Sequence, residues 1–265
     1  MNIIGQESIL RFIDSHNLSN LPRTIMLEGP FGSGRHLLSK YLAEKNNLEL
    51  IDISDNLNYE YIEFITLKVE PCLYIIDCNK ITVKNENAIL KFLEEPPKNS
   101  FIVLITENKH AQLDTIRNRC YTLTLQPYNE AQLKTFLNPS IPESALMICN
   151  TPGEILGLQE VSIEDLFALC NKIFDRIHDA SFANTLTLTN NLALKDEKDK
   201  YNVMLFMRAL ILVATQRVIR GAAYCYSDYA ITQDYFNRFN VKNVDKKYLF
   251  ENYLITLKKS RGGQS

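Results

Sequence analysis

A glycine-rich turn near the N-terminus has the residue spacing of a phosphate-binding loop. The segment reads Gly29-Pro30-Phe31-Gly32-Ser33-Gly34-Arg35-His36, between a short apolar run and leucines at helical spacing. Backbone N–H groups in such a strand-loop-helix turn cradle phosphate oxygens, as in the Walker A loop. The candidate nucleotide-binding residues of this loop are Gly29, Gly32, Gly34, Arg35 and His36. An ordinary strand-to-helix turn is the alternative explanation of the glycines.

The loop lacks the residues that carry out catalysis. A working loop continues with Lys and then Ser or Thr, whereas this chain has Arg35 and His36. The planar guanidinium does not replace a compact ammonium group at a tightly fitted site. The His36 imidazole does not replace the hard oxygen ligand that Mg²⁺ prefers. We therefore expect no metal site and no ATP hydrolysis by the chain alone. No cofactor is required, although ATP or ADP could bind without being hydrolysed.

A second apolar segment points to the same loss. Leu73-Tyr74-Ile75-Ile76-Asp77 has the form of a Walker B strand, which makes Asp77 a further candidate binding residue. Cys78 follows, where related ATPases that hydrolyse nucleotide usually carry a glutamate that polarises the attacking water. A thiol with an ordinary pKa of about 8.5 is mostly protonated at neutral pH and suits that task poorly. Together, the two segments favour a nucleotide site without its catalytic groups over a simple glycine turn.

The elements around these segments alternate between strand and helix as far as residue 126. Apolar or alternating runs predict strands at 24–27, 48–53, 72–76, 101–106 and 121–125. Helical spacing predicts helices at 7–16, after the glycine turn, at 85–95 and at 114–120. This alternation, with almost wholly apolar inner strands, predicts a three-layer α/β core with a parallel sheet.

The strand signals disappear after residue 126. Short helices are predicted at 130–137, 143–149 and 152–158, and longer ones follow Ser162 and continue at 201–219, 229–239 and 248–257. The chain therefore divides into a core at 1–126, a small helical lid at 127–160 and an all-α domain at 161–265. The basic end from Lys258 to Ser265 is expected to be a flexible tail.

Composition excludes several classes of protein. The 265 residues are 46% hydrophobic and 23% charged, and the net charge of −2 gives no overall bias toward nucleic acid. No two of the six cysteines are spaced like half of a zinc site. The N-terminus lacks the pattern of a signal peptide, and no apolar run is long enough to span a membrane. We expect a cytoplasmic protein with no membrane partner.

Several segments resemble the clamp-loader branch of the AAA+ ATPases, and within it the bacterial DNA polymerase III delta-prime subunits. They are Ile3-Ile4-Gly5-Gln6-Glu7, the Leu-Glu-Glu-Pro-Pro helix end at 93–97, the sensor 1 strand at 101–107, the Ser-Arg-Cys-like motif at 118–120 and, more weakly, 150–156. The chain departs from the family pattern at Asn118, which replaces the serine of that motif. It also has Glu154 where motor subunits carry arginine. Residues 43–71 lack the four-cysteine zinc insertion that many delta-prime and motor subunits carry. A carboxylate facing a triphosphate would repel it.

The resemblance implies roles for further residues. Thr106 falls at the sensor position, and Arg119 matches the arginine finger that acts in trans on a neighbouring subunit's nucleotide. Glu94 and Glu95 stand at a helix C-terminus, where acidic side chains are disfavoured. Either the two carboxylates are solvated and have little energetic effect, or they are used for contacts with other groups.

The function that the resemblance implies is a non-hydrolysing delta-prime-like subunit of DNA polymerase III. It would scaffold the loader ring through the C-terminal collar, beside delta and gamma/tau-like motor subunits. The sliding clamp and primer-template DNA would be partners of the whole assembly. Two alternatives stay open, namely an active but divergent AAA+ motor and a P-loop protein that binds nucleotide without turnover.

Overall fold

The computed structural model describes residues 3–160, 162–177, 200–221, 225–239 and 245–262. The chain forms two compact units. The first comprises Met1–Leu133 and Thr151–Gly153, and the second comprises Lys134–Asn150 and Glu154–Ser265. The division into core, lid and collar at residues 126 and 160 stays a prediction.

The first unit is built on a five-stranded parallel sheet with the strand order β2-β3-β4-β1-β5. The strands are β1 (Thr24–Glu28), β2 (Glu49–Asp52), β3 (Cys72–Asp77), β4 (Phe101–Thr106) and β5 (Tyr121–Thr124). The three inner strands are buried along nearly their whole length, whereas β2 and β5 are largely exposed. The apolar runs that predicted the inner strands follow from this burial on both faces of the sheet.

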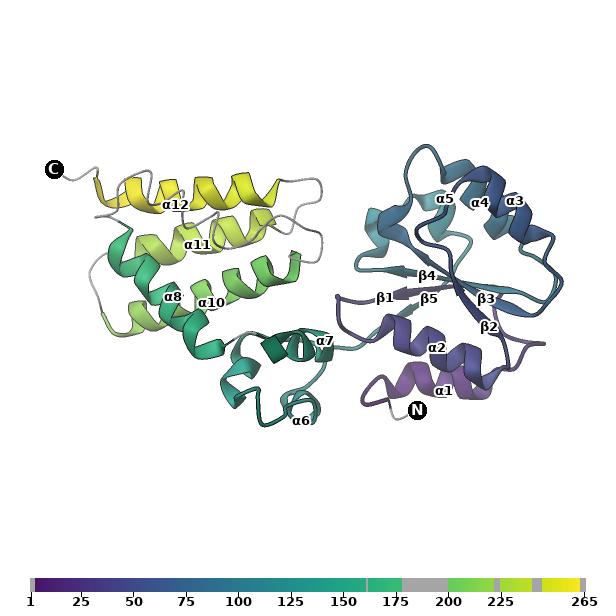
Figure 1. The fold of residues 1–265 in the computed structure, drawn as a ribbon, viewed down its shortest axis with the longest axis horizontal. Helices are drawn as coiled ribbons and strands as arrows, with labels where there is room; N and C mark the ends of the chain where they lie inside the picture. The colour runs from purple at the N-terminus through teal and green to yellow at the C-terminus, as the bar shows by residue number, and fades with distance from the viewer. Residues whose placement is uncertain (1–2, 161, 178–199, 222–224, 240–244, 263–265) are drawn as a thin grey trace. The chain divides into compact units, whose positions relative to one another are not determined.

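Helices cover both faces of this sheet (Figure 1). On one face lie α1 (Glu7–Ser15) and α2 (Arg35–Lys45), and on the other α3 (Tyr59–Thr66), α4 (Glu86–Glu94) and α5 (Asp114–Arg117). Each face has its own buried apolar cluster, with α1 and α2 in one and the other three helices in the second. The predicted three-layer α/β core with a parallel sheet is therefore confirmed.

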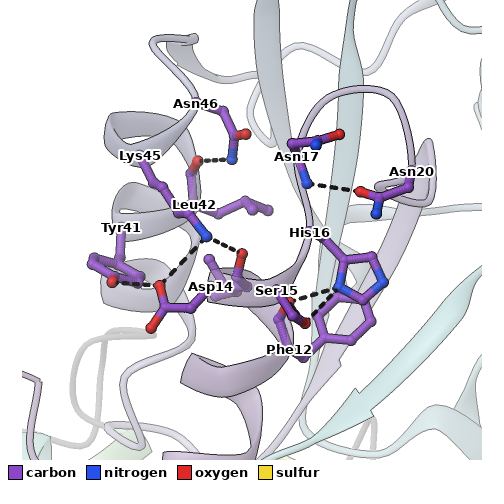
Figure 2. Close-up of polar contacts among 11 residues, drawn as sticks. Phe12, Asp14, Ser15, His16, Asn17, Asn20, Tyr41, Leu42, Lys45 and Asn46 are labelled. Atoms are coloured by element: carbon purple, nitrogen blue, oxygen red, sulfur yellow. Dashed lines mark hydrogen bonds and ion pairs between the residues drawn. The ribbon is translucent and has the colours of Figure 1, made fainter.

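Polar contacts join α1 to α2, the helix that follows the glycine turn (Figure 2). The Tyr41 hydroxyl donates to Asp14 Oδ1 at 2.8 Å, and Lys45 Nζ lies 3.5 Å from the same carboxylate. The lysine also donates to the Ile13 carbonyl at the end of α1. The hydrogen bond to Asp14 raises the pKa of Tyr41. These contacts fix α2 against α1 and so help to hold the turn at its start.

The second unit is helical. It contains two 3-10 helices, η3 (Glu143–Met147) and η4 (Gly157–Glu160), and most of α7 (Pro152–Leu156). The longer helices are α8 (Ile163–Arg176), α10 (Lys200–Ile219), α11 (Cys225–Phe239) and α12 (Lys246–Gly262). Helix α10 contacts both α8 and α11, and α11 packs against α12.

As predicted, Ser162 caps α8, because its hydroxyl accepts the Asp165 N–H at 3.2 Å. The short helix α6 (Glu130–Lys134) lies where the two units meet along the chain.

Some predictions need correction or fall outside the described residues. The prediction of a flexible tail is wrong for residues 258–262, because α12 continues to Gly262. Residues 263–265 lie outside the described part of the chain. Residues 178–199 of the predicted all-α domain also lie outside it. None of the helices described is long and apolar enough to cross a membrane.

Candidate functional site

The C-terminal ends of three neighbouring strands bring together segments that are far apart in the sequence. In the sheet register, Glu28 of β1 lies beside Thr106 of β4, and Asp77 of β3 lies beside Ile105 of β4. The Gly29 N–H donates to the Thr106 carbonyl at 3.0 Å. The glycine turn, Asp77 and Thr106 therefore share one edge, where open α/β sheets usually bind ligands.

The backbone of the turn requires its glycines. Gly32 and Gly34 have φ angles of 71° and 98°, in the left-handed region that favours glycine. Gly34 is also the N-cap of α2, and its carbonyl accepts the Leu38 N–H at 2.9 Å. A Cβ atom at Gly29 would lie 2.9 Å from both Leu125 Cβ and Ser33 Oγ. The turn therefore depends on glycine at these three positions, and its likeness to a phosphate-binding loop stays a prediction.

Residues from outside the loop cover part of it. Gly153 donates its N–H to the Gly32 carbonyl at 2.9 Å, and the Tyr128 hydroxyl donates to the Ser33 carbonyl at 2.8 Å. The Gly153 backbone is so close that an added Cβ would lie 2.4 Å from Gly32 Cα. Neither contact could be read from local sequence patterns, because each joins the turn to a residue about 100 positions away.

Two buried polar groups in the loop lack hydrogen-bond partners among the described residues. The Ser33 side chain is 1% exposed and Arg35 is 8% exposed, and neither Ser33 Oγ nor Arg35 Nη1 has a partner. Leaving such groups unpaired in the interior is costly, and a phosphate oxygen within reach would satisfy them. His36, by contrast, is exposed in the first turn of α2. The loop residues therefore fit an anionic group, but the position of the Mg²⁺ ligand does not fit the metal.

Asp77 and Thr106 use their polar atoms in local turns. The Asp77 carboxylate accepts the Asn79 N–H at 2.8 Å and so caps the 3-10 helix η1 (Cys78–Lys80). The Thr106 hydroxyl donates to the Asn108 carbonyl at 3.1 Å and accepts from Gln112 Nε2 at 3.2 Å. Cys78 is only 3% exposed. The structure places these predicted residues at the C-terminal edge of the sheet, as a nucleotide site requires. Whether they bind a nucleotide stays a prediction.

Glu28 is a feature of this edge that the sequence analysis missed. Its carboxylate accepts the Lys109 N–H at 3.0 Å and the Thr124 hydroxyl at 2.8 Å, and Lys109 Nζ lies 3.4 Å away. Lys109 opens the 3-10 helix η2 (Lys109–Ala111). Burial alone would raise the pKa of Glu28, but these contacts outweigh it and lower the pKa. An ionised carboxylate therefore stands directly before the glycine turn.

Glu154, which the family resemblance places at the arginine position of motor subunits, uses both carboxylate oxygens within the second unit. Oε1 accepts from Arg208 Nη1 at 2.7 Å, and Oε2 accepts the Asn150 N–H at 2.7 Å. Arg208 Nη1 also donates to the Ile148 carbonyl at 3.1 Å. The Glu154 side chain is 10% exposed. These contacts point to a packing role in which Glu154 of α7 is paired with Arg208 of α10.

Arg119 lies at the other edge of the sheet. It follows α5 and precedes β5, whose first residue Tyr121 lies beside Ile25 near the start of β1. The glycine turn follows the end of β1, so the length of this strand, roughly 15 Å, separates the two sites along the strand direction. Arg119 Nη1 donates to the Thr115 carbonyl at 2.7 Å, and Nη2 forms an ion pair with Glu94. The exposed Arg119 is thus remote from the chain's own glycine turn.

Comparisons with known proteins identify relatives of part of the chain. A family model described as DNA polymerase III, delta subunit, matches residues 51–129. The chain is 38% identical over 99 residues to DNA polymerase III subunit delta' of Bacillus subtilis, covering 36% of this chain and 30% of that protein. It is 31% identical over 84 residues to the delta' subunit of Buchnera aphidicola, covering 31% of this chain and 25% of that protein. The resemblance to delta-prime subunits is confirmed for this part. The matched stretches thus span less than a third of each relative.

Solved structures extend the likeness in fold. A DNA polymerase III gamma subunit-related protein of Thermotoga maritima has a TM-score of 0.52 and 18% identity, covering 96% of this chain and 98% of that one. The RuvB Holliday junction branch migration motor of Thermotoga maritima has a TM-score of 0.50 and 17% identity, covering 63% of this chain and 64% of that one. The predicted fold class, a three-layer α/β core with a parallel sheet followed by helical parts, is confirmed.

Proposed function

We propose that this delta-prime-like chain is a non-hydrolysing clamp-loader subunit of DNA polymerase III that supplies Arg119 to a neighbouring motor subunit. One observation carries the proposal: Arg119 is exposed at the sheet edge opposite the chain's own glycine turn. From there it cannot stabilise charge at its own loop. An arginine finger acts on the phosphates of a nucleotide held by another subunit, and it can be retained after the local catalytic groups are lost.

The residues at the C-terminal edge of the sheet, around the glycine turn, support the proposal that the chain does not hydrolyse ATP. Arg35, His36 and Cys78 stand where a working ATPase has its lysine, its magnesium ligand and its glutamate. The Asp77 carboxylate is used to cap η1, which leaves one oxygen fewer to organise a metal. The Glu28 carboxylate at this edge is already bonded to Lys109 and Thr124, and its lowered pKa makes it a weaker general base.

The helical second unit supports a scaffolding role. Helices α8, α10, α11 and α12 pack together, and in the proposal they join the chain to delta and gamma/tau-like subunits in a ring. The curated relatives are named as subunits of DNA polymerase III. In the assembled loader, the sliding clamp and primer-template DNA would be handled by the whole ring in the cytoplasm.

Arg119→Ala in a reconstituted loader tests the proposal. The loader is assembled from this chain with candidate delta and motor subunits, and its ATPase activity and subunit content are measured. Turnover at the one motor site served by this chain should fall by about 10³-fold, the lower end for an arginine finger, while the ring stays assembled. Arg117→Ala is the matched control, since Arg117 pairs with Asp114 in its own helix. An unchanged rate at that site with Arg119→Ala would remove the finger role.

A second candidate function is nucleotide binding without turnover, which the unpaired Ser33 Oγ and Arg35 Nη1 favour. Calorimetry with ATP and with ADP on the isolated chain tests it. Binding that weakens in Arg35→Ala, with no phosphate release, supports a bound structural nucleotide. If neither nucleotide binds, the chain is a scaffold alone. Magnesium-dependent turnover that Arg35→Ala abolishes would instead indicate a divergent motor.

A further inference from the structure

The ion pair between Glu94 and Arg119 links two motifs that lie 25 residues apart in sequence. Glu94 is the last residue of α4, within the Leu-Glu-Glu-Pro-Pro segment, and Arg119 follows α5. A carboxylate at a helix C-terminus is unfavourable, because it faces the negative end of the helix dipole. The ion pair with the Arg119 guanidinium offsets this unfavourable interaction, so it explains why a carboxylate is tolerated at this position.

The Arg119 guanidinium is held at two points that belong to different helices. Nη1 donates to the carbonyl of Thr115 in α5, at 2.7 Å, and Nη2 contacts the carboxylate of Glu94 at the end of α4. Both helices are anchored in the same buried cluster, through Phe92 of α4 and Ile116 of α5. The two partners of the guanidinium therefore have fixed positions relative to each other.

We propose that Glu94 is a positioning residue for Arg119, which keeps the guanidinium oriented toward the nucleotide of the neighbouring subunit. This inference rests on the proposed arginine finger. A guanidinium has five N–H donors, and the contacts with Thr115 and Glu94 use two, so others remain for phosphate oxygens. Holding a long side chain in one orientation lowers the entropy lost when it engages the reacting phosphate.

The pair is too exposed to matter much for folding. The Arg119 and Glu94 side chains are 36% and 50% exposed, and ion pairs of this kind contribute little to stability. Removing the Glu94 charge should therefore leave the fold intact and act only on the finger. This separates a positioning role from a structural one.

The test is Glu94→Gln in the reconstituted loader, with Glu95→Gln as the matched control at the neighbouring exposed residue. At the motor site served by Arg119, Glu94→Gln should lower kcat by about two- to fivefold and leave the KM for ATP unchanged. The thermal midpoint of the isolated chain should not move. Glu95→Gln should change none of these quantities.

The same substitution is then made in the Arg119→Ala loader. A residue that acts only through Arg119 has nothing left to position, so Glu94→Gln should cause no further loss there. An additional loss in that background would overturn the inference. An increase in kcat with Glu94→Gln alone would also overturn it, because the carboxylate would then be competing with the phosphate for the arginine.

The outcomes separate this inference from the proposed function. If Arg119→Ala leaves the loader's rate unchanged, the finger role falls and the positioning role falls with it. If Arg119→Ala lowers the rate but Glu94→Gln does not, the finger role stands and only the positioning role of Glu94 is wrong.

Discussion

The two edges of the parallel sheet use their polar groups in different ways. At the C-terminal edge, Gly32, Ser33, Asp77 and Thr106 bond to groups of the same chain. At the N-terminal edge, Arg119 is exposed and tethered by a carbonyl and one surface carboxylate. Under the proposed function, a local catalytic site is lost while a residue that acts on a neighbouring subunit is kept, and the length of the strands separates the two positions.

The two edges should also differ in how much their contacts contribute to the stability of the fold. Several contacts at the C-terminal edge, such as those of Thr106 and that of Tyr128 with Ser33, are buried or half-buried, so substitutions there should cost stability. Contacts at the N-terminal edge are exposed, so substitutions there should change activity in the assembly and leave the fold alone. Gly153→Ala and Glu28→Gln test the first half of this contrast, and Arg119→Ala and Glu94→Gln test the second. Glu154→Arg adds a largely buried ion pair of the second unit for comparison.

Glu154→Arg should have the largest effect on stability. The change removes a carboxylate that is 10% exposed and places a second cation beside Arg208, which is 24% exposed. We expect a loss of about 3 kcal/mol in the free energy of unfolding of the second unit, measured by denaturant titration. The charge-swapped pair Glu154→Arg with Arg208→Glu should recover part of it. A loss too small to measure would mean that Glu154 has no packing role.

Gly153→Ala should have an intermediate effect. The new Cβ would lie 2.4 Å from Gly32 Cα, so backbone must move. We expect a loss of about 1–3 kcal/mol in the free energy of unfolding of the first unit, because overpacking forces such shifts. Gly157→Ala is the control, since an added Cβ there has nothing within 4 Å. Equal melting temperatures for the two variants would show that the turn is not covered by Gly153.

Glu28→Gln should have the smallest effect, and it should depend on pH. The folded pKa of Glu28 is lower than its ordinary value of 4.5, so the unfolded chain binds the proton first as the pH falls. The stabilisation is present above pH 4.5 and is lost as the pH drops through the folded value. We expect Glu28→Gln to cost under about 1 kcal/mol at pH 7 and to flatten the acid decline. Parallel acid-unfolding curves for the variant and the wild type would contradict this.

Much of the fold could be predicted because its signals are local. Buried inner strands have almost wholly apolar sequences, and the glycine turn needs residues that accept a positive φ. Helix α3 was missed because Tyr59–Thr66 is rich in aromatic and β-branched residues, which favour strands. Asn58 caps this helix, and the burial of Ile62 and Ile65 in the core favours the helix over a strand.

The candidate site could be predicted only in part. The sequence identified Arg35, His36 and Cys78 as departures from a working ATPase and Arg119 as the finger candidate. It did not identify the partners of these segments, such as Tyr128 on the Ser33 carbonyl or Glu94 on Arg119. These contacts join residues 95 and 25 positions apart, and no short-range pattern encodes them.

The sequence by itself determined which catalytic groups the chain has and lacks, because residue identity sets charge, ligand type and proton affinity. It also determined the strands and the glycine frame, because burial and backbone sterics act over a few residues. Only the tertiary structure decided that the Gly32 and Ser33 carbonyls of the turn are bonded within the chain, while Arg119 stands exposed at the opposite edge of the sheet. The physical reason is that hydrogen bonds and ion pairs depend on distances that exist only once the parallel strands have brought remote segments together.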